Sequence, residues 1–308
     1  MSASRGPVLL CVGDIDMDLV VRVARPPGPD EKVDGRHVAR TPGGMAANVA
    51  VGASRLGTPV RLVGAVGDDA MGREALDALR AEGINLDHVV KRAGTATFFC
   101  VIMVDDRGEK SLVKVLSDAY LPRPDDITAS VFEGVAHVHL TFTEPALADR
   151  VVALAKAAGA TLSLDLEAAD LPDDRTALAG LIGSMDLLFI SRQSRVEVER
   201  LMGELPLRDG RTLVTTLGED GARLEKGSEV LAVPGHQVGV LDTSGAGDAF
   251  AAAFLHARLG GAPDGDALRF ANAAAALSTS QFGAQAGLPT RAETLRLLEA
   301  GTRETRRA

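Results

Sequence analysis

Short apolar runs alternate with amphipathic stretches along most of the chain. The apolar runs are bounded by turn residues, as is typical of buried strands: PVLLCVG, VRLVGAVG, VAHVHL, TLSLDL, DLLFIS and RTLVTTLG. Stretches such as MGREALDALRAEG and PALADRVVALAKAAG have helical spacing, and the last third of the chain is mainly helical. Strands that alternate with helices form parallel sheets. The pattern therefore predicts a three-layer α/β/α fold with a central, mostly parallel sheet.

Two segments interrupt this alternation. Residues 19–40 contain a Pro-rich turn, ARPPGPDEK, between two runs of alternating polar and apolar residues. Residues 95–116 contain the runs TFFCVIMV and KSLVKVL around a DDRGE turn. Both patterns indicate hairpins outside the main sheet. We expect insertions at about 17–41 and 95–116 to form a small β-sheet lid on a single domain covering residues 1–308, because no repeat or linker divides the chain.

Composition excludes several classes of function. The formal net charge of −9 argues against sequence-independent binding of nucleic acid, which needs a basic face. No apolar stretch approaches the ~18 residues of a membrane span, and the apolar run near the start is too short for a signal peptide. Cys11 and Cys100 are far apart in apolar runs, so they are predicted to be buried core thiols in a reducing, cytoplasmic setting.

The strongest chemical signal is LDTSGAGDAF, from Leu241 to Phe250. Gly245, Ala246 and Gly247 are small residues at the start of an Ala-rich helix, where backbone N–H groups can face an anion. A transferring phosphoryl group is such an anion. Asp248 follows directly and could accept the proton of an attacking hydroxyl. Its ordinary alternative is an acid that stabilises the helix macrodipole.

Two other nucleotide-binding motifs are excluded. The sixth position of a GxGxxG fingerprint would be Phe250, and the site lies in the last third of the chain. No Gly-Lys-Ser/Thr sequence occurs, so the chain has no P-loop. A weaker candidate is TTLGEDGA, from Thr215 to Ala222, where Gly218 and Gly221 could cradle phosphates or simply form a turn.

Two segments near the N-terminus carry candidate binding residues. In TPGGMAANVAVGASRLG, paired glycines permit close backbone approach, and Asn48 suits a polyhydroxyl ligand, although a plain loop-to-helix junction would look the same. In GDIDMDLV, Asp14, Asp16 and Asp18 follow the first strand, where open α/β sheets bind ligands. Leu19 and Arg25 rule out an EF-hand. An aspartyl-phosphate phosphatase would also place paired Asp residues here.

These segments, in this order, resemble the signature of the ribokinase-like (PfkB) carbohydrate kinases, and the likeness extends through FGAQAGLPT. The resemblance implies ATP and Mg²⁺ as cofactors, Asp248 as the catalytic base, and Gly245, Ala246 and Gly247 as the anion hole. It implies sugar contacts at Asp16, Asp18, Gly44, Asn48 and Glu144. It implies ATP contacts at Ser194, Thr216, Leu217, Gly218, Glu219, Asp220, Gly221, Gly247 and Asn272.

The resemblance also implies cation sites and a partner. Glu197 would bind Mg²⁺ through water, and a K⁺ ion beside the anion hole would match Asp242, Ser244, Ser278, Gln281, Gly283 and Gly287. The lid of such kinases often forms a dimer interface, so a homodimer is a further expectation. The chain departs from the family at Ser194, where Asn is usual, at Met45, where ribokinases have Lys, and at Asp16, where they have Asn.

The sequence therefore predicts a kinase that phosphorylates a hydroxymethyl group of a sugar. A nucleoside kinase of the same family is the nearest alternative. Tyr120 is the single Tyr and Trp is absent, so the side chains that stack on a nucleoside base would have to be Phe or His. A phosphatase using Asp14 and Asp16 and a non-catalytic sugar sensor are the alternatives of other classes.

Overall fold

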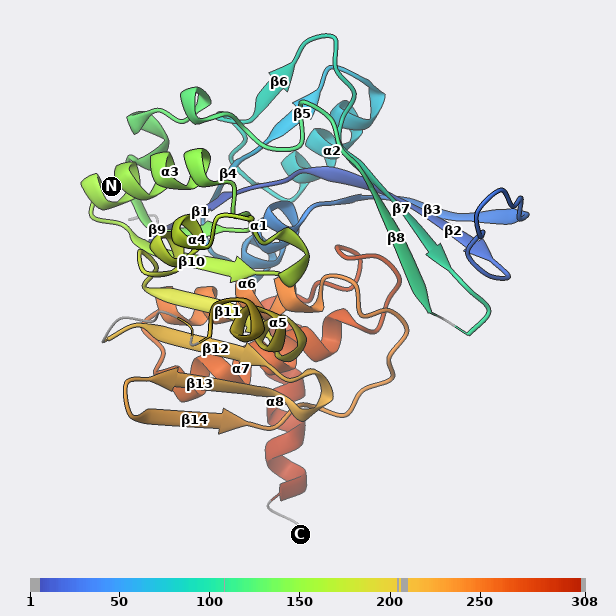
Figure 1. Cartoon of the computed structure of the whole chain (residues 1–308). Coiled ribbons are helices and arrows are strands. Elements are labelled where there is room, and N and C mark those ends of the chain that lie inside the picture. The colour runs from blue at the N-terminus through green and yellow to red at the C-terminus, as the bar shows by residue number, and fades with distance from the viewer. Residues whose placement is uncertain (1–5, 108, 204, 206–209, 306–308) are drawn as a thin grey trace.

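The computed structural model describes residues 6–107, 109–203, 205 and 210–305. Its centre is an eight-stranded sheet (Figure 1). Neighbouring strands are parallel except at one edge, where two antiparallel strands are added. The predicted mostly parallel sheet is confirmed. In spatial order its strands are β14 (Glu229–Val233), β13 (Ala222–Lys226), β12 (Thr212–Thr216), β11 (Leu187–Ser191), β10 (Thr161–Leu166), β9 (Val135–Leu140), β1 (Val8–Val12) and β4 (Val60–Val63).

Helices cover both faces of this sheet because alternate strand residues point to opposite faces. Leu9 and Cys11 of β1 pack in one core cluster, whereas Leu10 and Val12 pack in another. The first cluster includes residues of α1 (Met45–Leu56), α2 (Ala70–Ala81), α6 (Ala246–Leu259) and α7 (Asp264–Ser278), and α8 (Arg291–Thr305) packs against it. The second includes residues of α3 (Pro145–Ala157), α4 (Arg175–Ile182) and α5 (Arg192–Met202).

A separate four-stranded sheet projects from the body, as the two predicted hairpins require (Figure 1). Phe98, Cys100 and Ile102 form its own small core. The turn of the second hairpin contains residue 108, which lies outside the described residues. We call this sheet the lid. Its strands, in spatial order, are β3 (Gly35–Gly43), β2 (Asp16–Val23), β7 (Phe99–Val104) and β8 (Lys110–Val115).

One predicted strand is divided. The run VRLVGAVG contains β4 and a second short strand, β5 (Ala65–Gly67), which pairs with β6 (Val90–Arg92) rather than with the main sheet. The break falls at Gly64, where a Cβ would lie 2.8 Å from Ile15 and 2.9 Å from the Gly13 carbonyl oxygen. The sequence pattern did not reveal this close approach. Single turns of 3₁₀-helix occur at Pro124–Asp126, Ala129–Phe132, Ala168–Asp170 and Gly218–Asp220.

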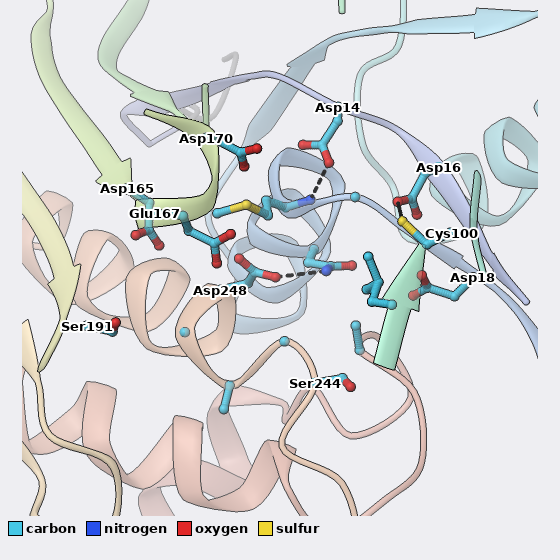
Figure 2. A pocket seen from close by; sticks show the side chains of 18 of the residues that line it. Asp14, Asp16, Asp18, Cys100, Asp165, Glu167, Asp170, Ser191, Ser244 and Asp248 are labelled. Carbon is cyan, nitrogen blue, oxygen red and sulfur yellow. Dashed lines mark hydrogen bonds between the residues drawn. The ribbon is translucent and has the colours of Figure 1, made fainter. Parts of the chain in front are cut away.

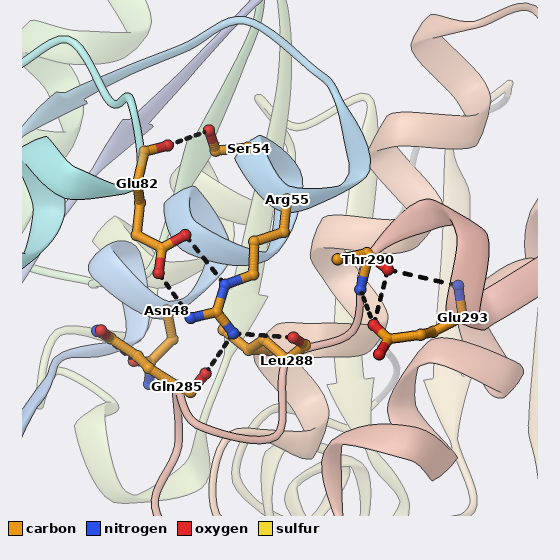
Figure 3. Close-up of polar contacts among 8 residues, drawn as sticks. All are labelled: Asn48, Ser54, Arg55, Glu82, Gln285, Leu288, Thr290 and Glu293. Carbon is orange, nitrogen blue, oxygen red and sulfur yellow. Dashed lines mark hydrogen bonds and ion pairs between the residues drawn. The ribbon is translucent and has the colours of Figure 1, made fainter.

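Arg55, in the last turn of α1, connects three parts of the body (Figure 3). Its guanidinium donates to the Glu82 carboxylate at 3.0 and 2.6 Å, and to the carbonyl oxygens of Gln285 and Leu288 at 2.7 and 2.8 Å. Just after this loop, Glu293 caps α8 by accepting from the backbone and hydroxyl of Thr290. Arg55 therefore fixes the loop that carries Gln285 against α1. None of the described helices has the length and apolarity needed to cross a membrane.

Candidate active site

Two cavities of about 360 and 450 Å³ meet at the first turn of α6. The first, which we call the acidic cavity, lies at the carboxyl ends of β1, β10 and β11 and beneath the lid. The second, the loop cavity, is lined by residues from the segments 216–221 and 235–240 and from part of α7. Ala246 and Gly247 line both cavities, whereas Asp248 lines only the acidic one. A group bound at the start of α6 can therefore be reached from either side.

The start of α6 depends on Gly245, its N-cap residue. Gly245 has φ of 72°, in the left-handed region that favours glycine, and a Cβ there would lie 2.8 Å from the Ala284 carbonyl oxygen. The first N–H groups of a helix lack intrahelical partners and carry partial positive charge. Apart from its chain neighbours and the backbone of α6 itself, no described atom lies within 4 Å of the position where Gly247 would carry a Cβ. An anion could therefore approach this turn, and the anion hole at Gly245, Ala246 and Gly247 stays a prediction.

Asp248 is the third residue of α6 and is buried, with 7% of its surface exposed. The Asn48 side-chain amide, on α1, donates to Asp248 Oδ2 at 2.8 Å, and Asn48 Oδ1 accepts from Gln285 at 3.0 Å. Burial raises the pKa of Asp248 well above its ordinary value, while the Asn48 hydrogen bond lowers it. A carboxylate with a raised pKa is a stronger base, which suits a proton acceptor.

Further acids surround Asp248 in the acidic cavity (Figure 2). Asp165 and Glu167, at the end of β10, lie on one side of it. Burial and the charge of Glu167 raise the pKa of Asp165 to about 7. The sequence analysis missed both residues. The signal was present in TLSLDLEAAD, because these acids lie at the end of a strand, near the edge where Asp14 follows the first strand.

Asp14 has a structural role at the other end of the cavity. Its carboxylate accepts from the backbone N–H groups of Met45 and Ala46 at 3.2 and 3.3 Å, and from the Thr141 hydroxyl at 3.3 Å. It therefore joins the end of β1 to the start of α1. Gly44, with φ of 97°, caps that helix, and a Cβ there would lie 2.6 Å from the Asp14 carbonyl oxygen. A carboxylate so fully engaged is a poor candidate for a phosphatase nucleophile.

Asp16 and Asp18 enter the cavity from the lid strand β2. The Cys100 thiol, on β7, donates to Asp16 Oδ2 at 3.4 Å. The structure thus brings together Asp16, Asp18, Gly44, Asn48 and Asp248 around one cavity. Glu144, predicted to contact the sugar, does not line it. Its carboxylate instead caps α3, accepting from the N–H groups of Ala146 and Leu147.

The predicted ATP residues divide into three groups. The loop cavity is lined by Thr216, Gly218, Glu219, Gly221, Gly247 and Asn272, whereas Ser194 lines the acidic cavity. Leu217 and Asp220 line neither: the Leu217 N–H donates to the Gly221 carbonyl, and Asp220 pairs with Arg192. The sequence analysis missed the loop segment 235–240, whose residues have no recognisable motif.

The predicted magnesium residue Glu197 also lies outside both cavities, where its carboxylate pairs with Arg200 at 3.0 Å. Ser194, which replaces the usual Asn of that motif, accepts at Oγ from the Ala168 N–H at 3.2 Å. The structure therefore separates Glu197 from the acids of the acidic cavity.

The predicted potassium positions form two loops that meet beside α6. Asp242 accepts from the N–H groups of Ser244 and Gly283 at 2.8 and 2.9 Å. Gly287 packs so closely on Ser278 that a Cβ would lie 2.0 Å from its carbonyl oxygen. Gln281 is exposed. A feature missed by the sequence analysis is Lys110, on lid strand β8, whose ammonium contacts the Asp242 carboxylate and lies 2.7 Å from the Ser244 hydroxyl.

Comparison with known proteins agrees with this geometry. The sequence pattern described as pfkB family carbohydrate kinase matches residues 8–291. Ribokinase from Bacillus subtilis (strain 168) is 33% identical over 303 residues, which cover 94% of this chain and 99% of that protein. The ATP-dependent ribose-1-phosphate kinase of Halopiger xanaduensis is 32% identical over 290 residues, covering 90% of this chain and 93% of that protein.

The fold is similar to that of a solved relative. The structure of Arabidopsis thaliana ribokinase complexed with ribose and ATP superposes with a TM-score of 0.81 at 27% identity. The match covers 96% of this chain and 99% of that chain.

Proposed function

Since this chain belongs to the pfkB family of carbohydrate kinases, we propose that it transfers the γ-phosphoryl group of ATP to a hydroxymethyl group of a sugar. One observation carries the proposal: the first turn of α6 borders both cavities, with the Asp248 carboxylate on the acidic side. The sugar would occupy the acidic cavity and ATP the loop cavity. The two substrates would then meet at Ala246 and Gly247.

In this mechanism, Asp248 takes the proton of the sugar hydroxyl as the hydroxyl oxygen attacks the γ-phosphorus, and the bond from that phosphorus to the bridging oxygen breaks, so that ADP leaves. The Asn48 amide holds the accepting carboxylate in place through its 2.8 Å hydrogen bond. The backbone N–H groups at the start of α6 stabilise the charge of the transferring phosphoryl group. The lid, which contributes Asp16 and Asp18, would close over the sugar and exclude water, which limits wasteful ATP hydrolysis.

ATP is used as its magnesium complex in reactions of this kind, and the ion would neutralise part of the phosphate charge. The residues present fit it, because Mg²⁺ prefers carboxylate oxygens and Asp165 and Glu167 line the acidic cavity beside Asp248. We infer that these two acids, rather than Glu197, interact with the ion or its water shell.

Potassium use and dimerisation stay predictions. The Asp242 and Gly283 loops supply the positions expected for a potassium ion, but the Lys110 ammonium contacts the same carboxylate. Val38 and Val113 of the lid are each 49% exposed, and Leu116, directly after β8, is 62% exposed, which favours burial against a second lid. Light scattering at micromolar concentration distinguishes that dimer from a monomer.

Substitution of Asp248 by Asn tests the proposed function. The amide keeps the shape of the side chain but cannot accept the proton, so kcat should fall by about 10²–10⁴-fold. Nucleotide affinity should change less than about twofold, because Asp248 does not line the loop cavity. The assay is ADP release, coupled to a reporter enzyme, over pentoses, hexoses, sugar acids and nucleosides.

The outcomes separate the alternatives. ADP release that needs both a free sugar and Asp248 supports the sugar kinase. Release with ribosides alone identifies a nucleoside kinase. If no compound stimulates ADP release while several sugars raise the melting temperature, the chain is a sensor and the catalytic proposal is wrong. Retention of more than about a tenth of wild-type kcat by Asp248→Asn would count against Asp248 as the base.

A further inference from the structure

Asp16, Asp18 and Cys100 form a compact group of metal-ligand side chains at the lid end of the acidic cavity (Figure 2). Asp16 and Asp18 are two residues apart on β2, so their side chains lie on the same face of the lid sheet. Cys100, on the neighbouring strand β7, pairs in register with Asp18. One ligand atom from each residue lies within 4.8 Å of those of the other two. The pairing of two lid strands therefore brings together two carboxylates and a thiol.

One oxygen atom of this group has no donor. Asp16 is 4% exposed, and its Oδ1 atom has no hydrogen-bond partner in the described part of the chain. Buried polar atoms are almost always satisfied, by protein groups, by water or by an ion. A Cβ at Gly43 would lie 2.3 Å from Asp16 Oδ1 and 2.7 Å from Asp18 Oδ2, so the glycine keeps the space beside both oxygens open. The group therefore offers a buried acceptor that the rest of the chain does not use.

Positive charge is scarce around these acids. Among the described residues that line the acidic cavity, Lys114 is the single cationic side chain, and it donates to both oxygens of Asp170 at 2.6 and 2.9 Å. None of the ion pairs of the described residues involves Asp16 or Asp18. Buried charges in proteins are usually paired or bound to a metal ion. Since no side chain of the described part supplies the pairing charge, a cation from solution is the natural partner.

The thiol makes the group selective among cations. Cys100 donates to Asp16 Oδ2 with 3.4 Å between sulfur and oxygen. In tetrahedral zinc sites, bonds of about 2.3 Å to sulfur and about 2.0–2.2 Å to oxygen place these two atoms about 3.5–3.7 Å apart. The observed separation is thus close to that of two ligands of one ion. A sulfur ligand favours Zn²⁺ or Co²⁺, whereas Mg²⁺ and Ca²⁺ prefer oxygen ligands alone.

Cys100 would have to bind as a thiolate. Burial and the charges of Asp16 and Asp18 raise the pKa of this thiol, so it keeps its proton beside the acids alone. A divalent cation reverses that electrostatic effect, and the proton would pass to solvent as the sulfur binds the ion. The hydrogen bond from Cys100 to Asp16 would then be replaced by two bonds to the ion.

We propose that Asp16, Asp18 and Cys100 bind one thiophilic divalent cation, such as Zn²⁺, and that the bound ion excludes the sugar from the acidic cavity. The ion would occupy the carboxylates that the sugar is predicted to contact. Zn²⁺ would therefore inhibit the reaction, in contrast to the Mg²⁺ that accompanies ATP. The metal site is independent of the proposed kinase function, whereas the exclusion of a sugar substrate rests on it.

Cobalt absorption tests the metal site without ATP or sugar. A thiolate bound to Co²⁺ gives a strong charge-transfer band, and Cys11 and Cys100 are the two cysteines of the chain. We expect the band to saturate with one equivalent of Co²⁺ in the wild type and to be lost in Cys100→Ala. The matched control is Cys11→Ala, which removes a thiol buried in the first core cluster and should keep the band. Circular dichroism checks that both variants are folded. No band in the wild type, or an equal band in Cys100→Ala, would overturn the proposal.

The double variant Asp16→Asn/Asp18→Asn tests the carboxylate ligands. The affinity for Zn²⁺, measured by displacement of Co²⁺, should fall by about 100-fold or more, because amides replace the charged oxygen ligands. Asp77→Asn/Asp149→Asn is the matched control, which removes two exposed acids outside the cavity lining and should behave as the wild type. Mg²⁺ and Ca²⁺ should leave the cobalt band of the wild type unchanged. Equal Zn²⁺ affinity in the two double variants, or displacement of Co²⁺ by Mg²⁺, would contradict the ligands assigned here.

Release of ADP at a constant concentration of its magnesium complex with ATP tests the exclusion of the sugar. Chromatography of ADP avoids a coupling enzyme that Zn²⁺ could inhibit. We expect Zn²⁺ to raise KM for the best sugar with little change in kcat, and that sugar to weaken the cobalt band. Zn²⁺ should have little effect on KM in Cys100→Ala, in which any effect of Zn²⁺ on ATP itself would remain.

The outcomes separate this inference from the proposed function. Inhibition that excess sugar does not relieve, or a cobalt band that sugar does not weaken, would overturn the exclusion of the sugar. If the cobalt band needs Cys100 but no sugar gives ADP, the kinase function is wrong and the metal site stands. If a sugar gives ADP but Co²⁺ gives no band, the metal site is wrong and the kinase function stands.

Discussion

Asp248 is a buried carboxylate whose basicity depends on a neighbour from another helix. The Asn48 amide donates to it at 2.8 Å across a separation of 200 residues. Two effects oppose each other: burial favours the protonated acid, and the hydrogen bond favours the carboxylate. The pH dependence of the reaction is therefore a property of this pair.

Replacement of Asn48 by Leu should shift the pH profile to higher pH. The variant removes the donor that favours ionised Asp248, so the pKa of Asp248 rises and the acidic limb of kcat/KM moves upward. A hydrogen bond to a charged group is worth about 1.5–3 kcal/mol, which corresponds to about one to two pH units. The measurement is kcat/KM from pH 4 to 9.

The control is Ser54→Ala, further along the same helix, where the hydroxyl donates to the Glu82 carbonyl oxygen. Its acidic limb should coincide with that of the wild type. An unchanged limb in Asn48→Leu, or a shift toward acid, would contradict the role given to this hydrogen bond.

Helices α1 and α6 place these two residues by packing closely together. Gly52 of α1 faces Ala252 of α6, and a Cβ at Gly52 would lie 2.9 Å from the Ala252 Cβ. Neither methyl group could move aside without moving its backbone. The short side chain at 52 therefore sets the spacing of the helices that carry Asn48 and Asp248.

Gly52→Ala should consequently reduce both stability and activity. Overpacking of this kind costs about 1–3 kcal/mol, which for a chain of this length lowers the melting temperature by about 2–5 °C. We expect kcat to fall several-fold, because the base and its donor move apart. Thermal denaturation and ADP release measure the two effects. Gly180→Ala in α4 is the control, since a Cβ there meets no atom within 4 Å; equal behaviour of the two variants would refute the argument.

The sequence was most informative where the pattern of residues within a single strand, hairpin or turn is enough to identify it. The buried strands, the two hairpins and the Gly245–Asp248 turn could all be predicted, because periodicity and turn residues are local. Contacts between distant elements could not be predicted, as Asn48 with Asp248 shows. Asp165 and Glu167 were missed because two acids at the end of a strand are common on protein surfaces. Glu144 was assigned to the sugar from resemblance, although it caps a helix in this chain.

At the scale of the whole molecule, the lid is joined to the body beside the anion hole. Lys110 is the first residue of lid strand β8, and its ammonium contacts Asp242 and Ser244, just before α6. Burial raises the pKa of Asp242, but hydrogen bonds from Gly283, Lys110 and Ser244 outweigh it and lower the pKa to about 2. Asp242 is thus an ionised carboxylate that needs a cation, and the lid supplies one.

Lys110→Met should therefore expose a requirement for a monovalent cation. With Lys110 in place, we expect kcat to differ less than about twofold between potassium and sodium. Without it, the Asp242 carboxylate loses its partner, the loop before α6 is less firmly held, and kcat in sodium should fall at least tenfold. Potassium should restore part of the loss, because it can bind the oxygen atoms of the same two loops.

The matched control is Lys156→Met, which removes an exposed lysine of α3 and should leave kcat unchanged in both salts. Strong potassium dependence of the wild type would mean that the ion, not the lysine, balances Asp242. A Lys110→Met variant with wild-type kcat in sodium would mean that the contact between lid and body has no part in catalysis. The expected pattern would instead mean that the anion hole forms only when the lid contacts the loop before α6. Phosphoryl transfer would then occur only after the lid covers the sugar site.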